Sequence, residues 1–223
     1  MQSATTLFKA LKDLGYDNRS QDSWWWPESG SFKVVVGAIL TQNTTWSNVE
    51  KTLKILEDNS LISLEKLSNI DLPTLEKLIK ASGFYRAKAK NIKNLSLNIL
   101  QDFGSFNNFK TDVTREWLLN QKGIGNESAD AILNYACYKE AFVVDSYTAR
   151  VLNSFGYEFS NYLELQEWIV DDFYIGYRDV FANINRAQAY ARAHGMIVEY
   201  CKVNKKGKNI NINEIKNYLK KLV

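Results

Sequence analysis

Apolar residues recur at helical spacing along almost the whole chain, and this periodicity constrains the fold more than any other feature of its 223 residues. The clearest repeats are Leu7, Leu11 and Leu14, then Val49, Leu53 and Leu56, then Ile92, Leu95 and Ile99. Glycines break the pattern between repeats, and Pro73 follows Asp71 where a helix is expected to start. The apolar run 142–144 is too short to predict a strand. We therefore expect an all-α protein of about ten or more short helices.

The counts of histidine and cysteine exclude several kinds of site. One histidine and two cysteines cannot supply a four-ligand zinc site or a cysteine-ligated iron–sulfur cluster, so we expect no metal and no cofactor. The two cysteines, Cys137 and Cys201, are far apart in the chain. We expect both thiols to be structural and reduced rather than joined in a disulfide.

The N-terminal and apolar segments bear on localisation. Residues 1–15 lack the basic and apolar regions of a signal peptide. The longest apolar run, Val34 to Leu40, is far too short to cross a bilayer. We therefore expect a cytoplasmic protein with no membrane partner.

Positive charge is concentrated in two stretches, although the net charge is only +3. Residues 202–223 carry seven lysines and one glutamate, which leaves the rest of the chain slightly acidic. The stretch 80–101 carries five basic residues, Lys88 among them, and no acidic residue. Each stretch alone is most simply a solvated helix face, so charge by itself does not indicate a nucleic-acid partner.

A Gly-x-Gly turn joins two predicted helices in the middle of the chain. Residues 121–126 read QKGIGN and are flanked on both sides by apolar residues at helical spacing. Glycines two positions apart permit positive φ angles and close approach of the backbone to a ligand, and Asn126 is suited to cap the second helix. The backbone amides of such a turn, with Lys122 beside them, can bind an anion. An ordinary helical hairpin has the same pattern, so the turn alone does not decide between the two.

Four ordered segments together resemble the helix-hairpin-helix DNA glycosylases related to endonuclease III. The segments are 40–44 (LTQNT), 83–89 (GFYRAKA), the turn 121–125 and the apolar run that ends at Asp145. The resemblance implies a helical glycosylase fold that binds DNA without a cofactor.

The same resemblance implies several DNA contacts. In the family the hairpin amides hold a DNA phosphate, which assigns DNA-binding roles to Lys122, Gly123 and Gly125. Gln42 would fill the gap left by an extruded nucleotide. An equally good interpretation is that Gln42 is simply a polar residue at the end of a helix, with no contact to DNA. Lys88 and its basic neighbours, and the lysines of the tail, would contact phosphates and give affinity without sequence preference.

Asp145 is the candidate catalytic residue, because it lies 20 positions after Gly125, where the resemblance places the catalytic aspartate. A role as a helix N-cap is the simplest structural interpretation and is compatible with catalysis. An ionised carboxylate would stabilise positive charge that develops on the sugar, and it could orient the attacking water. Family members that also cleave the strand carry a lysine two positions after the second hairpin glycine, where this chain has Glu127. The resemblance therefore implies a monofunctional glycosylase.

The segment from Trp24 to Pro27 is the most unusual motif, since three adjacent indole rings cannot all face one core. Trp25, Trp26 and Pro27 are candidate walls of a base pocket, with Trp46 on the opposite face, because a flipped base is held by aromatic stacking. Core packing explains one or two of these rings equally well. An indole face also attracts the positive charge of an N-alkylated purine. The chain lacks the cysteines that bind an iron–sulfur cluster in many members of the family. It therefore resembles the branch without that cluster, the MagIII-type 3-methyladenine DNA glycosylases.

The implied architecture has two helical lobes with a DNA-binding cleft. Residues 31–137 would form a six-helix barrel lobe that ends in the hairpin, and residues 1–30 and 138–223 would form a second helical lobe. The implied activity is hydrolysis of the N-glycosidic bond of alkylated purines such as 3-methyladenine, flipped out of double-stranded DNA. We expect a monomer associated with a bacterial nucleoid.

Two alternatives stay open. A non-catalytic helix-hairpin-helix DNA-binding protein would keep the hairpin and lose the chemistry, but the position of Asp145 counts against it. A glycosylase for a neutral damaged or mismatched base would need hydrogen-bonding residues near the aromatic cluster, and these are few.

Overall fold

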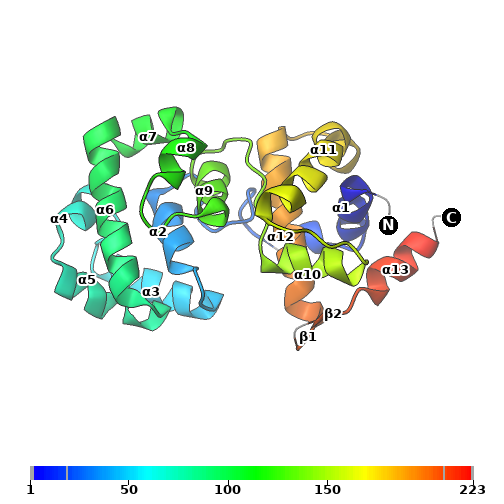
Figure 1. The fold of residues 1–223 in the computed structure, drawn as a ribbon, viewed down its shortest axis with the longest axis horizontal. Helices are drawn as coiled ribbons and strands as arrows, with labels where there is room; N and C mark the ends of the chain where they lie inside the picture. The colour runs from blue at the N-terminus through cyan, green and yellow to red at the C-terminus, as the bar shows by residue number, and fades with distance from the viewer. Residues whose placement is uncertain (1–2, 19, 208, 222–223) are drawn as a thin grey trace. The chain divides into compact units, whose positions relative to one another are not determined.

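The computed structural model describes residues 3–18, 20–207 and 209–221, and the chain divides into two compact units (Figure 1). Unit 1 comprises Met1–Pro27 and Glu140–Val223, and unit 2 comprises Glu28–Lys139. The units therefore divide after Pro27 and after Lys139, against the expected boundaries after residues 30 and 137.

The described residues of unit 2 form eight α-helices. They are α2 (Phe32–Leu40), α3 (Trp46–Asp58), α4 (Leu64–Asn69), α5 (Leu72–Leu78), α6 (Tyr85–Phe103), α7 (Phe106–Asp112), α8 (Arg115–Leu119) and α9 (Asn126–Ala131). A short 3-10 helix, η2 (Lys80–Ser82), precedes α6, and a π-helical turn, η3 (Ile132–Ala136), continues α9. The six-helix barrel expected for this lobe stays a prediction. Several of these helices are short because capping residues and glycines interrupt the chain. Ser63 and Thr114, for example, cap the short helices α4 and α8.

The described residues of unit 1 form five α-helices and one small hairpin. They are α1 (Ala4–Asp13), α10 (Ser146–Ser154), α11 (Tyr162–Val180), α12 (Arg186–Asn204) and α13 (Asn213–Lys220), with a 3-10 turn, η1 (Tyr16–Asn18). The antiparallel strands β1 (Lys205–Lys206) and β2 (Asn209–Ile210) pair within the basic tail. The prediction of an all-α fold is confirmed.

The predicted helical stripes form the buried faces of their helices. Helix α6 buries Ile92, Leu95 and Ile99, as the spacing predicts, because residues three and four apart lie on one side of a helix. Helix α5 begins after Asp71, whose carboxylate accepts a hydrogen bond from the Thr74 amide at 2.9 Å. Capping and periodicity together therefore account for where these helices start and which side they bury.

The core of unit 1 is built around aromatic rings and positions the segment that leads into α10. Phe8, Phe142 and Phe173 are fully buried, and the rings of Phe8 and Phe142 lie 5.7 Å apart. The run 142–144 is buried and has no regular secondary structure, so Phe142 anchors the chain just before Asp145. This anchoring fixes where α10 begins.

Two further observations concern the length of the apolar helices and the state of the cysteines. Within the described residues, no helix is both long enough and apolar enough to cross a membrane. Cys137 and Cys201 are buried free thiols, as predicted, and burial raises the pKa of each to about 12. At neutral pH both thiols are therefore protonated and unreactive.

Candidate functional site

Asp145 caps the N-terminus of α10 with one of its two carboxylate oxygens. Its Oδ1 accepts hydrogen bonds from the Thr148 amide at 2.8 Å and from the Thr148 hydroxyl at 2.9 Å. The Thr148 hydroxyl oxygen in turn accepts from the Asp145 amide at 3.4 Å, which completes a capping box. The carboxylate is thus held in one orientation, beside the positive end of the helix dipole.

The second oxygen of Asp145 faces the only histidine of the chain. His194, on α12, is buried, and its Nε2 lies 3.6 Å from Oδ2 of Asp145. Burial alone would raise the pKa of Asp145, but the interaction with His194 and the hydrogen bonds from Thr148 outweigh it, so that this pKa lies below its usual value. Asp145 is therefore an anion at neutral pH, as a group that stabilises positive charge must be.

Trp25 packs directly against the histidine and its neighbour in the chain. The indole of Trp25 lies edge-on to the His194 imidazole, with ring centroids 5.3 Å apart. A Cβ atom at Gly195 would lie 2.3 Å from Cγ of Trp25, so only glycine leaves room for the ring at that position. Trp25, His194 and Asp145 therefore form one contiguous set within unit 1.

A carboxylate fixes the edge of the Trp25 indole. The Trp25 Nε1–H donates a hydrogen bond to Oε1 of Glu199 at 3.1 Å. The Lys202 ammonium donates to the same oxygen at 2.7 Å and lies 5.8 Å from the centre of the indole. These contacts orient Trp25, which also adopts a left-handed backbone conformation with φ of 69°.

The other members of the tryptophan motif have different environments. Trp26 is 8% exposed, and its ring lies 6.3 Å from that of Trp25, so it is largely a core residue. Pro27 is exposed at the end of unit 1. Trp46 is the partly exposed first residue of α3, in unit 2, and its pairing with the other aromatic residues across a flipped base stays a prediction.

A cavity of about 150 Å³ lies in unit 1 beside Trp25. Asp17, Asp22 and Arg192 contribute to its walls, and Asp17 forms a two-point ion pair with Arg192. These polar walls differ from the aromatic walls expected of a base pocket. Within the described residues, no group of three or more histidine, cysteine, aspartate or glutamate side chains could hold a metal ion.

The predicted hairpin joins α8 to α9 in unit 2, and its turn lies at the surface. Lys122, Gly123 and Gly125 are all exposed, and Gly123 has a φ of +84°, as the Gly-x-Gly pattern indicated. The expected cap is wrong: Gly125, not Asn126, is the N-cap of α9. Asn126 is instead the first residue inside the helix, and its side-chain oxygen accepts a hydrogen bond from Arg115 at 3.0 Å.

A buried ion pair joins the two helices of this hairpin. Arg115, on α8, donates from Nε to one oxygen of Asp130 at 2.8 Å and from Nη2 to the other at 3.1 Å. The Asp130 side chain, on α9, is only 1% exposed. The two-point pair and the hydrogen bond to Asn126 therefore link α8 to α9 on either side of the turn.

Gln42 contacts the hairpin from the segment between α2 and α3. Its side-chain amide donates hydrogen bonds to the Gly123 carbonyl and to the Ser128 hydroxyl, both at 2.9 Å. The structure thus attaches the candidate gap-filling residue to the hairpin turn. Its expected entry into DNA stays a prediction.

The structure contradicts the expectation that Lys88 contacts phosphates. Lys88 is 2% exposed, and its ammonium donates hydrogen bonds to the Leu40 carbonyl at 2.8 Å and to the Ser82 carbonyl at 2.7 Å. The physical reason is its place on α6, where it shares the buried face with Ile92. Burial lowers its pKa to about 8.

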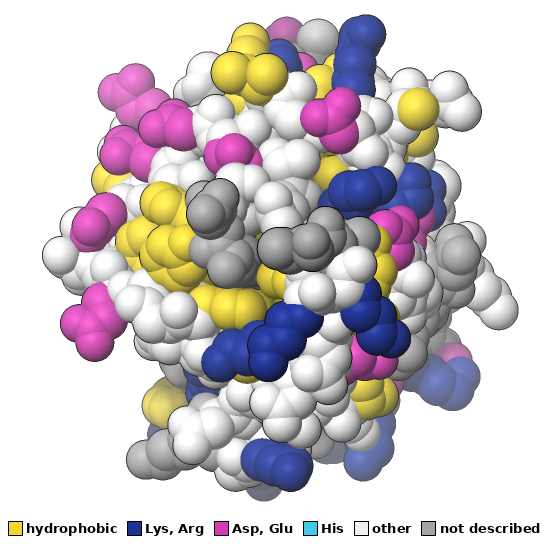
Figure 2. Space-filling model, turned by 90° about the vertical axis from the view of Figure 1, so that its right-hand side faces the viewer, with side chains coloured by type: hydrophobic (Ala, Val, Ile, Leu, Met, Phe, Trp, Pro, Cys, Tyr) yellow, Lys and Arg dark blue, Asp and Glu magenta, His cyan; other side chains and the backbone are white. Residues whose placement is uncertain are grey.

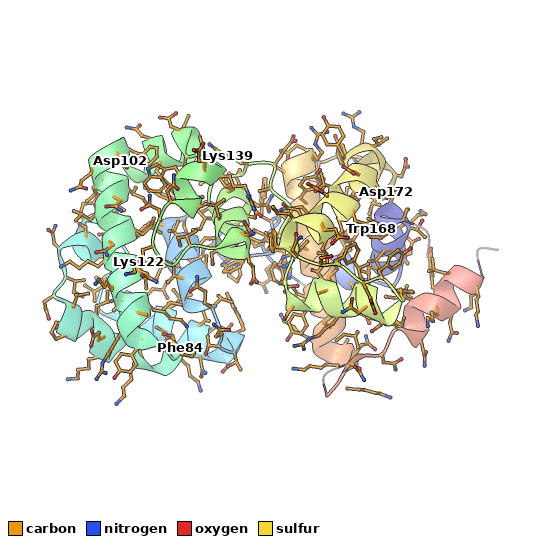
Figure 3. All side chains as sticks on the ribbon, in the orientation of Figure 1. Phe84, Asp102, Lys122, Lys139, Trp168 and Asp172 are labelled. Atoms are coloured by element: carbon orange, nitrogen blue, oxygen red, sulfur yellow. The ribbon has the colours of Figure 1, made fainter. Side chains whose placement is uncertain are left out.

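Several residues of the site were not expected from the sequence. Phe84 is 72% exposed with a φ of 46°, and Figure 3 marks it at the N-terminal end of α6 and Lys122 in the turn before α9. The exposed residues Lys80, Arg86 and Lys90 lie near Phe84 in the chain. The motif 83–89 places an aromatic residue among basic residues, and this pattern could have indicated an exposed aromatic ring at Phe84. The contacts of His194, Gly195 and Glu199 depend on packing between distant segments, although the His194–Gly195 pair itself resembles a pair found near the C-terminus in the family.

The basic tail is partly folded onto unit 1. Ile210, Ile212 and Ile215 are buried in its core, which leaves most tail lysines exposed; Lys208 lies outside the described residues. On the face drawn in Figure 2, basic side chains lie among acidic and apolar ones and do not form a single patch. The phosphate contacts expected of the tail stay a prediction.

Comparison with known proteins places the chain among proteins of DNA base excision repair. The family model described as "HhH-GPD superfamily base excision DNA repair protein" matches residues 36–161. A protein of Methanocaldococcus jannaschii named as a DNA repair glycosylase is 38% identical over 204 residues, which cover 88% of this chain and 86% of the relative. The chain is also similar to a crystal structure of the H. pylori 3-methyladenine DNA glycosylase MagIII bound to 1,N6-ethenoadenine. That match has a TM-score of 0.87 and 44% identity, and covers 92% of this chain and 99% of the other. A non-covalent endonuclease III–DNA complex shares the fold at 18% identity, with a TM-score of 0.72 and coverage of 99% and 100%.

Proposed function

Because the chain belongs to the HhH-GPD superfamily of base excision DNA repair proteins, we propose that it is a monofunctional glycosylase for alkylated purines such as 3-methyladenine. That the chain is a DNA glycosylase, with DNA as its partner, follows from the family and its relatives. We further propose that it acts as a monomer on double-stranded DNA.

One observation carries the proposal: the ionised Asp145 carboxylate is joined through His194 to the indole of Trp25. The charged group and an aromatic ring that could hold a base therefore belong to one rigidly packed set. A DNA-binding protein without chemistry has no need of such a set, which argues against the non-catalytic alternative.

The proposed reaction uses Asp145 as an electrostatic catalyst. As the bond between the sugar C1′ and the base nitrogen breaks, positive charge develops on the sugar, and Oδ2 of Asp145 would stabilise it. The same oxygen could accept a proton from the water that attacks C1′. An alkylated purine carries positive charge and leaves readily, so a single carboxylate suffices without a strong general acid.

Glu127 supports the monofunctional character. It is an exposed residue in the first turn of α9, at the position where the strand-cleaving members of the family carry lysine. A carboxylate cannot form a Schiff base with the opened sugar. We therefore expect that borohydride traps no covalent complex between this protein and DNA that contains an abasic site. A trapped complex would refute this part of the proposal.

The substrate class is proposed from the aromatic residues and from MagIII. An indole such as that of Trp25 attracts a cationic base, with energies of about 0.5–2 kcal/mol. MagIII was crystallised with 1,N6-ethenoadenine, an uncharged damaged base, so a neutral adduct is the second candidate substrate.

The experiment that tests the proposal measures free base released from methylated duplex DNA and from duplex DNA with one ethenoadenine. We expect release of 3-methyladenine and strand breaks only after alkali treatment. Trp25→Ala and Trp46→Ala should each reduce release, and full activity of Trp46→Ala would exclude it as a stacking partner. Binding of damaged DNA without release of any base would favour the non-catalytic alternative.

A further inference from the structure

Lys88 is a buried cation that the proposed chemistry does not use, and its two hydrogen bonds join two separate parts of unit 2. One acceptor is the carbonyl of Leu40, the last residue of α2, and the other is the carbonyl of Ser82, the last residue of η2. The backbone amide of Lys88 also donates to the Phe84 carbonyl at 3.1 Å. A single side chain therefore holds the chain at two points 42 positions apart in the sequence.

Each of these two points is the root of a surface segment. Residues 41–44, the Gln42 segment, follow Leu40, and residues 83–84, the Phe84 segment, follow Ser82. Each segment contains a non-glycine residue in left-handed conformation, Asn43 with φ of 51° and Phe84 with φ of 46°. Such conformations are unfavourable and persist only where the surrounding contacts enforce them. Both residues are exposed, so their conformations are held by contacts at the roots of the segments and, for the Gln42 segment, by the hydrogen bonds of Gln42 to the hairpin.

Lys88 lies where it can hold the roots of both segments. The carbonyls at the end of α2 have no partner within the helix and carry the negative end of its dipole, which an ammonium stabilises. Burying a lysine is unfavourable unless its donors find acceptors, and here two carbonyls accept from two of its three donors. A methionine of similar length would fill the space and leave both carbonyls without this donor.

We propose that Lys88 is a positioning residue that holds the Gln42 segment and the Phe84 segment in one fixed arrangement, so that both meet DNA as a unit. The DNA-facing role of the segments rests on the proposed function, whereas the bridge between them does not. Lys88 acts through these segments and touches neither the base nor the sugar.

The first test needs no DNA and compares amide hydrogen exchange in the whole chain with that of Lys88→Met. We expect peptides that contain residues 41–44 and 83–84 to exchange about tenfold faster in the variant, since a buried donor to two carbonyls is lost. Peptides from α11 and α12 should be unchanged. The control is Leu95→Ala, which removes a buried side chain from the same helix and should not accelerate the two segments together. Acceleration of only one segment, or uniform acceleration of unit 2, would overturn the proposal.

The second test keeps Lys88 in place and does not depend on the folding of Lys88→Met. Single-turnover base release is measured for Gln42→Ala, for Phe84→Ala and for the double variant, on the duplex that the wild type processes best. We expect the two effects to be non-additive by about threefold or more, because contacting or linked residues show coupling of this size. Additive effects would show that the segments act independently and would refute the proposal. Absence of base release from every duplex would count against the proposed function, while hydrogen exchange would still decide on the bridge.

Discussion

Gly195 provides the space that the Trp25 indole occupies: a Cβ atom at position 195 would lie 2.3 Å from Cγ, 2.6 Å from Cδ1 and 2.7 Å from Cδ2 of the ring. Real side chains do not approach this closely, so the ring and the glycine depend on each other. Since His194 precedes Gly195 and faces Asp145, the fit also fixes the distance between aromatic ring and carboxylate.

Gly195→Ala should therefore displace Trp25 and slow base release by about tenfold to a hundredfold, because a shift of about 1 Å in a site has effects of that size. Single-turnover release from methylated DNA measures the rate, and thermal unfolding measures the stability. In a Trp25→Ala background the added methyl group meets no ring, so the same substitution should cost little stability there. An equal loss of stability in both backgrounds would contradict the steric explanation.

Gly123→Ala should weaken DNA binding by disturbing the hairpin turn. The left-handed φ of +84° costs an alanine about 1–2 kcal/mol, and the added Cβ would lie 1.9 Å from the Asn91 side-chain amide. The matched control is Gly104→Ala, which has a similar φ of +72° but no atom within 4 Å of the added Cβ. Titration with labelled duplex should show weaker binding for Gly123→Ala alone. Equal affinity of the two variants would argue against a role of the turn in binding.

Arg115→Leu should lower the free energy of unfolding by about 3–5 kcal/mol, because it leaves the buried Asp130 carboxylate without its cation. Urea unfolding at neutral pH measures this loss. Arg86→Leu is the control, since the Arg86 side chain is 80% exposed and lies 3.9 Å from Glu76. An exposed pair of that kind contributes about 0–1 kcal/mol. A small effect of Arg115→Leu would show that the hairpin does not depend on the ion pair.

Asp145→Asn should reduce base release by about a hundredfold to a thousandfold while DNA binding persists, because asparagine keeps the helix cap but not the charge. The folded pKa of Asp145 lies below its unfolded value of 3.8, so its ionised form contributes stability above that pH. This contribution is lost as the pH falls through the folded pKa. Urea unfolding should therefore show a difference between wild type and Asp145→Asn at pH 7 that shrinks below pH 3.8. Retention of full base release by the variant would refute the proposed role of Asp145.

The sequence predicted those features that depend on near neighbours. The start of α5 at Asp71, the glycines of the hairpin and the buried faces of the helices follow from capping and periodicity, which act over a few residues. Asp145 was also predicted to cap a helix, and the structure confirms this. Its catalytic role was inferred from a resemblance and stays a prediction.

Other features depend on packing between distant segments and could not be derived locally. His194 meets Asp145 only because α12 packs against α10, and the sequence places the two residues 49 positions apart. Lys88 was expected at the surface because it is charged, although its spacing to Ile92 places it on the apolar face of α6. In that case the periodicity was informative, and the general preference of lysine for the surface was misleading.

The two oxygens of Asp145 have different surroundings, and the proposed function assigns only one of them to the reaction. Oδ1 is committed to Thr148 and the start of α10, whereas Oδ2 points to His194. Exchange of this one oxygen for an amide nitrogen would preserve the cap and leave every helix in place. Under the proposed mechanism, a relative with that change would retain the same fold and the same DNA-binding surface. It would bind damaged sites without releasing the base. Under the proposed mechanism, a single atom of this side chain therefore separates a protein that excises damaged bases from one that only binds them.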